Sequence, residues 1–200
     1  PIAVFPNESE NLRDLYGLIA HELVHQWFGD LVTCKDWSEL YLNEGFAVYY
    51  SYLYDGHKNG NDALLHAVYN DRKGILYNKD EKRPIVSRKY NHAWDQFDQR
   101  AYAKGGWVLH MLRSQLGEDL FRRCVTHYLK KNALSSVDTH DLQQAFEEIT
   151  GLSLLPFFDQ WVHNAGHPDL KVSYDWMPHE KLAKISVEQL QAAAVAKGKE

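Results

Sequence analysis

The sequence predicts a mainly α-helical domain that is followed by a β-hairpin. Apolar side chains recur at helical spacing in several segments, and glycine, proline or aspartate residues separate these segments. After Pro168 apolar and polar residues alternate instead, as they do in a half-buried strand. Apolar residues make up 44% of the 200 residues and aromatic residues 13%, which is typical of a globular protein with a packed core.

The first helix is expected over residues 12–27, where apolar side chains recur at helical spacing. Asn7 and Glu10 stand three residues apart and match a capping pair near its start, and Gly29 matches its end. A short extended segment, 31–34, separates this helix from the next one.

The second helix is expected over residues 37–54. Asp36 and Glu39 form another capping-box pattern at its start, and Asp55-Gly56 marks its end. Aromatic residues crowd its second half, and we expect them to pack in the core rather than to form a ligand cage. These residues are Phe46, Tyr49, Tyr50, Tyr52 and Tyr54.

Five further helices and one long loop are expected before the hairpin. Residues 78–94 are charged and contain Pro84, which predicts a loop long enough to have a function of its own. The hairpin is expected over 169–189 and opens a β-domain, with a frayed tail up to residue 200. The helices are expected over 62–77, 101–116, 118–131, 139–150 and 156–163.

The charge of the chain argues against a nucleic-acid-binding protein. Lys and Arg number 22 and Asp and Glu 27, so the formal net charge is -5. No apolar run reaches the length of a membrane span. Cys34 and Cys124 are expected to be two buried thiols rather than a disulfide. The sequence lacks an initiator Met and a signal peptide, so we expect it to begin inside a longer protein, and the few cysteines favour the cytoplasm.

A pair of histidines in the first helix predicts a metal site. His21 and His25 are four residues apart, so both project from one face of the helix within reach of one ion. Zinc binds imidazole nitrogens and carboxylate oxygens, and catalytic zinc sites combine three protein ligands with a water. Glu22 is offset around the helix, from where it can reach that water without binding the metal. This five-residue pattern alone is weak evidence, because two helical histidines are often ordinary surface or core residues.

A third ligand is expected in the second helix. Glu44 follows His25 after a spacer of eighteen residues. Two antiparallel helices joined by a short connection would put such a residue beside the histidine pair. The alternative for Glu44 is an ordinary solvated carboxylate, which its apolar neighbours disfavour.

Residues 21–47 closely resemble the aminopeptidase N and leukotriene hydrolase family of gluzincin zinc peptidases, and the likeness extends over about residues 10–176. A motif of the form H-E-x-x-H, an eighteen-residue spacer and Glu marks this family. Three sequence blocks in the family's order are more specific evidence for this resemblance than one block alone. They are His21-Glu22-Leu23-Val24-His25 with Gln26-Trp27-Phe28-Gly29, then Asn43-Glu44-Gly45-Phe46-Ala47, then Ala101-Tyr102-Ala103-Lys104-Gly105-Gly106, which contains the family's Y-x-K-G.

The resemblance implies a thermolysin-like zinc peptidase catalytic subdomain built as a helical bundle. It implies one zinc ion per chain, bound by His21, His25 and Glu44. Glu22 would be the general base that activates water, and Tyr102 would stabilise the developing oxyanion. The implied function is zinc-dependent hydrolysis of amino-terminal residues from peptide substrates by a metal-activated water.

Two parts of the family pattern are missing from this sequence. The Gly-x-Met-Glu-Asn block, which binds the substrate's free amine, and the amino-terminal β-domain both precede the zinc helix in the family. We therefore expect residues 1–168 to be the carboxy-terminal, helical part of the catalytic domain of a longer parent protein, and 169–200 to begin the next domain. The alternatives left open are a catalytically incomplete zinc-stabilised fragment or scaffold, an epoxide hydrolase and an endopeptidase.

Overall fold

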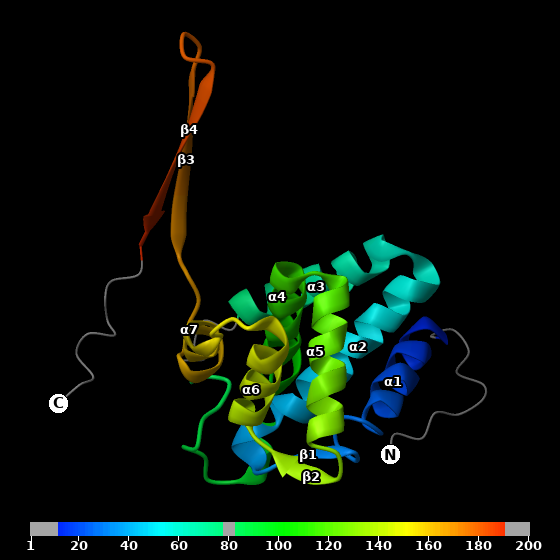
Figure 1. Ribbon diagram of the computed structural model, residues 1–200. Helices are drawn as coiled ribbons and strands as arrows, with labels where there is room; N and C mark the ends of the chain where they lie inside the picture. Colours follow the sequence, from blue (N-terminus) through cyan, green and yellow to red (C-terminus); the bar gives the residue numbers. More distant parts are fainter. Residues whose placement is uncertain (1–11, 78–82, 191–200) are drawn as a thin grey trace, which may run out of the picture. The chain divides into compact units, whose positions relative to one another are not determined.

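The computed structural model describes residues 12–77 and 83–190, which form two compact units that divide between Ala165 and Gly166. The first unit is helical and the second is a β-hairpin (Figure 1). The predicted fold class, mainly α-helical with a hairpin, is therefore confirmed. The predicted cap at Asn7 and Glu10 and the predicted tail lie outside the described residues. Among the residues described, no helix is both long and apolar enough to cross a membrane.

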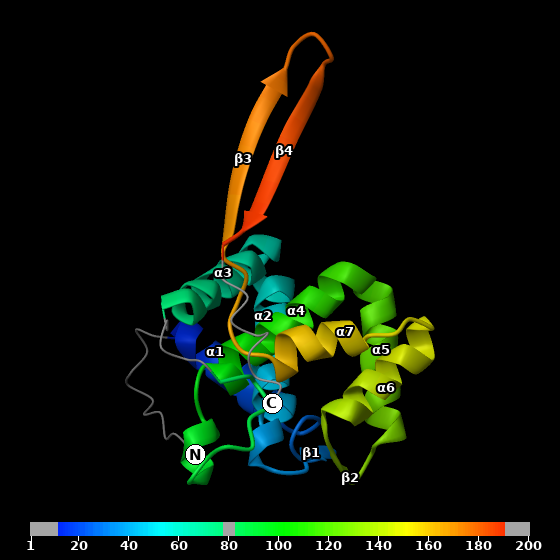
Figure 2. The same cartoon turned by 90° about the vertical axis from the view of Figure 1, so that its left-hand side faces the viewer.

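The helical unit is organised around α2, which lies between α1 and α4 and also packs against α3 (Figures 1 and 2). The hairpin consists of β3 (Leu170–Met177) and β4 (Leu182–Gln189). The elements of the helical unit, with η for 3-10 and π-helices, are α1 (Leu12–Val24), β1 (Val32–Cys34), η2 (Trp37–Glu39), α2 (Tyr41–Asn59), α3 (Asn61–Tyr77), η3 (Ala93–Gln96), η4 (Arg100–Lys104), α4 (Gly105–Leu116), α5 (Glu118–Lys131), β2 (Ser135–Val137), α6 (Thr139–Thr150), α7 (Leu155–Phe158) and η5 (Asp159–His163).

The first helix ends earlier than the sequence predicts. Its last regular residue is Val24, well before Gly29. The amides of Gln26 and Trp27 donate to carbonyls three residues earlier, at 3.1 and 3.0 Å, so the chain tightens as it leaves the helix. His25 consequently lies at the point where the regular helix stops.

The second helix begins and ends later than predicted. The capping box at its start is only half right. Asp36 does cap the segment, since its carboxylate accepts from the amide of Ser38 at 2.8 Å, but the carboxylate of Glu39 does not turn back to Asp36. It accepts instead from the amide and hydroxyl of Thr139 at 3.1 and 2.6 Å, so the residues before α2 form the 3-10 helix η2. At the other end α2 continues through Gly56 and stops before Gly60, whose φ is +93°.

The aromatic residues of α2 have two different environments. Phe46 and Tyr49 are fully buried, as predicted, and Tyr50 packs against the core. Tyr54 is 45% exposed, so the prediction that all five residues pack in the core is wrong. Tyr54 instead lines a cavity that runs along α2.

Two glycines allow the backbones of α2 and α4 to touch. A Cβ atom on Gly45 would lie 2.9 Å from the carbonyl carbon of Gly105, and one on Gly105 would lie 3.1 Å from the Cα of Gly45. Backbone atoms cannot move aside as a flexible side chain can. Any larger residue at Gly45 would therefore push α2 and α4 apart.

A small parallel sheet was not predicted. β1 pairs with β2, which lies between α5 and α6, in the register Val32 to Ser135 and Cys34 to Val137 (Figure 2). Each strand has only three residues, and about a hundred residues separate them, so no local pattern reveals the pairing. Within the described residues both thiols are free, and Cys34 is half-buried while Cys124 is buried.

The hairpin has one apolar face. Alternate residues of β3 pair with alternate residues of β4, among them Val172 with Val187 and Tyr174 with Ile185. Since neighbouring residues of a strand point to opposite faces, these side chains share a face and the intervening charged and hydroxyl side chains share the other.

Replacement of Gly45 by Ala should destabilise the helical unit by about 1–3 kcal/mol, because the added methyl group overlaps the backbone of α4. Thermal unfolding followed by circular dichroism measures the effect. Gly17→Ala is the matched control. Gly17 lies within α1 with open space around it, so this change should leave stability unchanged or raise it by about 0.5–1 kcal/mol. Equal melting temperatures for the Gly45→Ala variant and the parent chain would contradict the assignment of a close contact.

Candidate metal centre

Three side chains from α1 and α2 converge on one point. His21 and His25 stand at the end of α1 and face Glu44 in the first turn of α2. The Nε2 atom of His21 lies 3.2 Å from the Nε2 atom of His25 and 3.2 Å from Oε2 of Glu44, and His25 Nε2 lies 3.4 Å from the same oxygen. Across the part of the chain that the structure describes, this is the one group of three His, Cys, Asp or Glu side chains whose donor atoms lie within 4.8 Å of one another.

The backbone orients one of the two imidazoles. His25 Nδ1 lies 2.9 Å from the carbonyl oxygen of Phe28. A carbonyl oxygen can only accept, so Nδ1 carries the proton and donates it. In the neutral ring Nε2 then keeps a free lone pair, which points into the cluster. This is the tautomer that a metal ligand requires.

The spacing of the three donor atoms fits zinc. At metal–ligand distances of about 2.0–2.1 Å, two ligands of a tetrahedral zinc ion are about 3.3 Å apart. The three separations of 3.2, 3.2 and 3.4 Å agree with this value. Two imidazoles and one carboxylate are also a donor set that catalytic zinc sites use, with the fourth position open to water or substrate.

The electrostatics of the cluster favour a cation. Burial raises the pKa of Glu44, but hydrogen bonds with His21 and His25 outweigh burial and hold the pKa at about 2. The hydrogen bond with Glu44 in turn raises the pKa of His25, against the opposing effect of burial. Glu44 is therefore a carboxylate at neutral pH, and its charge attracts either a proton on His25 or a bound metal ion.

The other two predicted site residues face the same space. A cavity of about 1020 Å³ is lined by His21, His25 and Glu44 together with Glu22 and Tyr102. Glu22 is exposed. The structure thus brings all five predicted residues to one cavity, which continues along α2 past Tyr52 and Tyr54.

Tyr102 stands opposite the histidines. Its ring is nearly parallel to that of His21, with 6.3 Å between the ring centroids and 10° between the planes. Burial, the charge of Glu44 and a hydrogen bond with Glu44 all raise the pKa of Tyr102 above its usual range. The phenol therefore keeps its proton at neutral pH and can donate a hydrogen bond into the cavity.

Tyr102 is the middle residue of η4, a π-helix of five residues. Such wide turns are rare and are often found at functional sites. The carbonyl oxygen of Ala101 in the same segment would lie 3.2 Å from a Cβ on Gly45, so η4 is close to the first turn of α2. Contact with α2 thus holds Tyr102 beside Glu44.

Several groups that hold the site could not be identified from the sequence. The carbonyl of Phe28 orients His25, and a backbone group leaves no signal in the residue type. Glu39 ties the start of α2 to α6, although its spacing from Asp36 suggested a local cap. Asn43 offered a signal, because it stands next to Glu44 in the second block, and its side chain accepts from the amide of Cys34 at 3.1 Å.

Comparisons of the sequence with known proteins identify its relatives. Residues 4–161 match the model of the peptidase family M1 domain. The Tricorn protease-interacting factor F2 of Thermoplasma volcanium is 37% identical over 162 residues, which are 78% of this chain and 21% of that protein. Aminopeptidase 2 of Candida albicans is 37% identical over 164 residues, 78% of this chain and 17% of that protein. The chain thus spans about a fifth of the length of these relatives.

Solved structures show the same fold. Aminopeptidase A of Legionella pneumophila, solved with aspartic acid, superposes with a TM-score of 0.75 at 24% identity. The matched region covers 90% of this chain and 20% of the Legionella chain. A mutant M1 zinc metallopeptidase of Deinococcus radiodurans, solved with a Tyr-Ser-Ala substrate, superposes with a TM-score of 0.66 at 26% identity. The matched region covers 83% of this chain and 36% of the Deinococcus chain. Since the family model matches most of the sequence, the chain belongs to peptidase family M1.

Proposed function

We propose that this chain carries the zinc site of an aminopeptidase, in which His21, His25 and Glu44 bind one zinc ion. The observation that carries the proposal is the spacing of their three donor atoms, which suits tetrahedral zinc, beside Glu22 and Tyr102 in one cavity. The names of relatives such as aminopeptidase 2 support peptides as the substrate class. Because the chain spans only a fifth of those relatives, the activity is proposed for the full-length protein.

Glu22 is proposed as the general base. A zinc ion at this site would polarise the scissile carbonyl and make water more acidic. The exposed carboxylate of Glu22, which lines the cavity without belonging to the donor cluster, accepts a proton from the attacking water. The same carboxylate then passes the proton to the leaving amine, so that Glu22 ends the cycle ionised as it began.

Tyr102 is proposed to stabilise the transition state. When water attacks a peptide carbonyl, negative charge develops on the carbonyl oxygen. The phenol of Tyr102 lines the same cavity as Glu22 and stands beside the ring of His21. It keeps its proton at neutral pH and can donate to that oxygen. A donor aimed at a developing charge acts on the transition state more than on the bound substrate.

Changes at Glu44 and Glu22 should separate metal binding from catalysis. Glu44→Ala should lose most of its zinc, because two imidazoles alone bind it weakly, whereas Glu22→Gln should keep about one zinc per chain. Elemental analysis of the purified chains measures both. In the full-length protein Glu22→Gln should lower kcat by about 100- to 10,000-fold. The exposed Glu188→Gln in β4 is the matched control and should change neither quantity.

The outcomes distinguish the proposal from its rivals. A folded chain that takes up no zinc, even after reconstitution, would favour the alternative of a scaffold without catalytic function. Normal turnover in Glu22→Gln would show that another group is the base.

Tyr102→Phe should lower kcat by about 100- to 1000-fold and leave KM nearly unchanged, because the lost hydrogen bond forms in the transition state. Steady-state kinetics with an aminoacyl substrate measures both constants. Tyr174→Phe, at an exposed position of the hairpin, is the control and should behave as the parent protein. An increase in KM alone would mean that Tyr102 binds substrate without a role in the chemical step.

A peptide with an acetylated amino terminus should remain intact when the same peptide with a free amine is cleaved. An aminopeptidase must recognise the positive charge of the free amine, and acetylation removes it. Mass spectrometry of the two digests detects the difference. Cleavage of the blocked peptide at an internal bond would identify an endopeptidase.

A further inference from the structure

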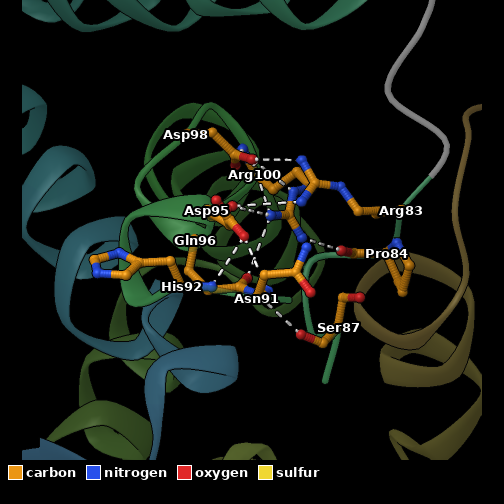
Figure 3. A network of polar contacts seen from close by, with 9 residues as sticks. All are labelled: Arg83, Pro84, Ser87, Asn91, His92, Asp95, Gln96, Asp98 and Arg100. Atoms are coloured by element: carbon orange, nitrogen blue, oxygen red, sulfur yellow. Dashed lines mark hydrogen bonds and ion pairs between the residues drawn. The ribbon is translucent and has the colours of Figure 1, made fainter. Parts of the chain in front are cut away.

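Arg100 is a buried arginine at the start of η4. Its side chain is 3% exposed, and each of its three guanidinium nitrogens donates to an acceptor (Figure 3). Nε donates to Asp98 Oδ2 at 2.9 Å, and Nη1 donates to the carbonyl oxygen of Pro84 at 3.1 Å. Nη2 donates to the carbonyl oxygen of Asp95 and to Oε1 of Gln96, at 3.0 and 3.2 Å. A buried charge needs such partners, because its desolvation is otherwise costly.

These partners come from three places along the chain. Pro84 belongs to the loop that leads towards η3, Asp95 and Gln96 belong to η3 itself, and Asp98 lies in the turn before η4. Arg100 is the first residue of η4. Its side chain therefore holds the start of the π-helix against the loop and η3, as Figure 3 shows.

A continuous chain of bonds leads from Arg100 to Tyr102. The carboxylate of Asp98 accepts from the Arg100 guanidinium and from its backbone amide, both at 2.9 Å. The carbonyl oxygen of Asp98 accepts from the amide of Tyr102 at 3.2 Å and from that of Ala101 at 3.1 Å. The position of Asp98 thus determines where the peptide unit of Tyr102 lies. Arg100 holds Asp98 in place together with Arg83, whose Nη2 donates to Asp98 Oδ2 at 3.1 Å.

We infer that Arg100 is a positioning residue for Tyr102, which it fixes through Asp98 at the start of the π-helix so that the phenol faces the donor cluster. The inference rests on the proposed function for its effect on catalysis. Arg100 itself neither belongs to the donor cluster nor lines the cavity. The planar guanidinium is needed because it binds Asp98, Pro84 and η3 at once, whereas a lysine ammonium on its flexible stem cannot reproduce these fixed directions.

A merely structural role for Arg100 predicts something different. If the guanidinium only stabilised the loop, Arg100→Lys would lower the melting temperature, but the folded protein would have the parent kcat. If it positions Tyr102, the folded protein loses activity through Tyr102 alone. The two roles are therefore separated by measuring Arg100→Lys with and without the phenol of Tyr102.

The first measurement does not depend on catalysis. The protein is labelled with 3-fluorotyrosine, and the ¹⁹F resonance that disappears in Tyr102→Phe is assigned to Tyr102. In Arg100→Lys this resonance should shift or broaden while most other tyrosine resonances stay in place, and zinc content should be unchanged. Arg122→Lys is the matched control, since Arg122 is an exposed arginine of α5, and it should leave the Tyr102 resonance unchanged.

The second measurement is a kinetic cycle in the full-length protein. Arg100→Lys should lower kcat by about tenfold with KM within about twofold, since a small displacement of a catalytic group is costly. In the Tyr102→Phe background the same change should have an effect below about twofold, because the group it positions is already absent. Asp98→Asn weakens the contacts of this side chain with both Arg100 and Arg83 and keeps the backbone carbonyl. It should give a loss of the same kind and replaces Arg100→Lys if that variant does not fold.

The inference is overturned by an unchanged Tyr102 resonance in folded Arg100→Lys, or by an equal loss of kcat in both backgrounds. Failure of the proposed function is recognised separately. If Tyr102→Phe itself retains the parent kcat, Tyr102 has no role in the reaction, and the ¹⁹F resonance alone then decides whether Arg100 positions its ring.

Discussion

The contact between the backbones of α2 and α4 determines where the chemistry of this chain can take place. Gly45 and Gly105 allow these helices to approach until backbone meets backbone. Glu44 immediately precedes Gly45, and Tyr102 lies three residues before Gly105, so one contact sets the distance between the carboxylate and the phenol. On another side α2 packs against α1, which supplies the histidines. The five residues of the site meet because one helix is held closely by its neighbours.

Much of this arrangement could be predicted from the sequence, since the signals were local. Helices α3, α5 and α6 have amphipathic spacing and end at or near Gly or Asn, and the spacing from His21 to Glu44 correctly predicted that these side chains meet. Prediction failed where a distant residue competes with a local one. Glu39 binds Thr139 instead of capping its own helix, and the pairing of β1 with β2 joins segments about a hundred residues apart. The hydrogen bonds of Arg100 could not be predicted from the sequence, because two of the acceptors are backbone carbonyls.

Two buried charged residues of the helical unit have a similar role. Glu39 and Arg100 are both 3% exposed, and each bonds a residue distant in sequence, Glu39 with Thr139 and Arg100 with the carbonyl oxygen of Pro84. Each residue stands where a helix with a site residue begins. Glu39 lies just before α2, which carries Glu44, and Arg100 is the first residue of η4, which carries Tyr102. Apolar side chains in these places could add stability, but their contacts would not fix the orientation of the helix start. Hydrogen bonds of fixed geometry instead determine how each helix starts, which a site with donor atoms a few ångströms apart requires.

The hairpin has a consequence for how this chain behaves in solution. A two-stranded ribbon is marginal in water by itself, and each of its strands pairs on one side only within the described residues. The free edges expose unpaired amide and carbonyl groups beside an apolar face that carries Val172, Tyr174 and Ile185. Such an edge accepts any strand of suitable register, whether from its own protein or from another molecule. While these edges stay unpaired, β3–β4 is therefore the segment from which aggregation by sheet growth would start.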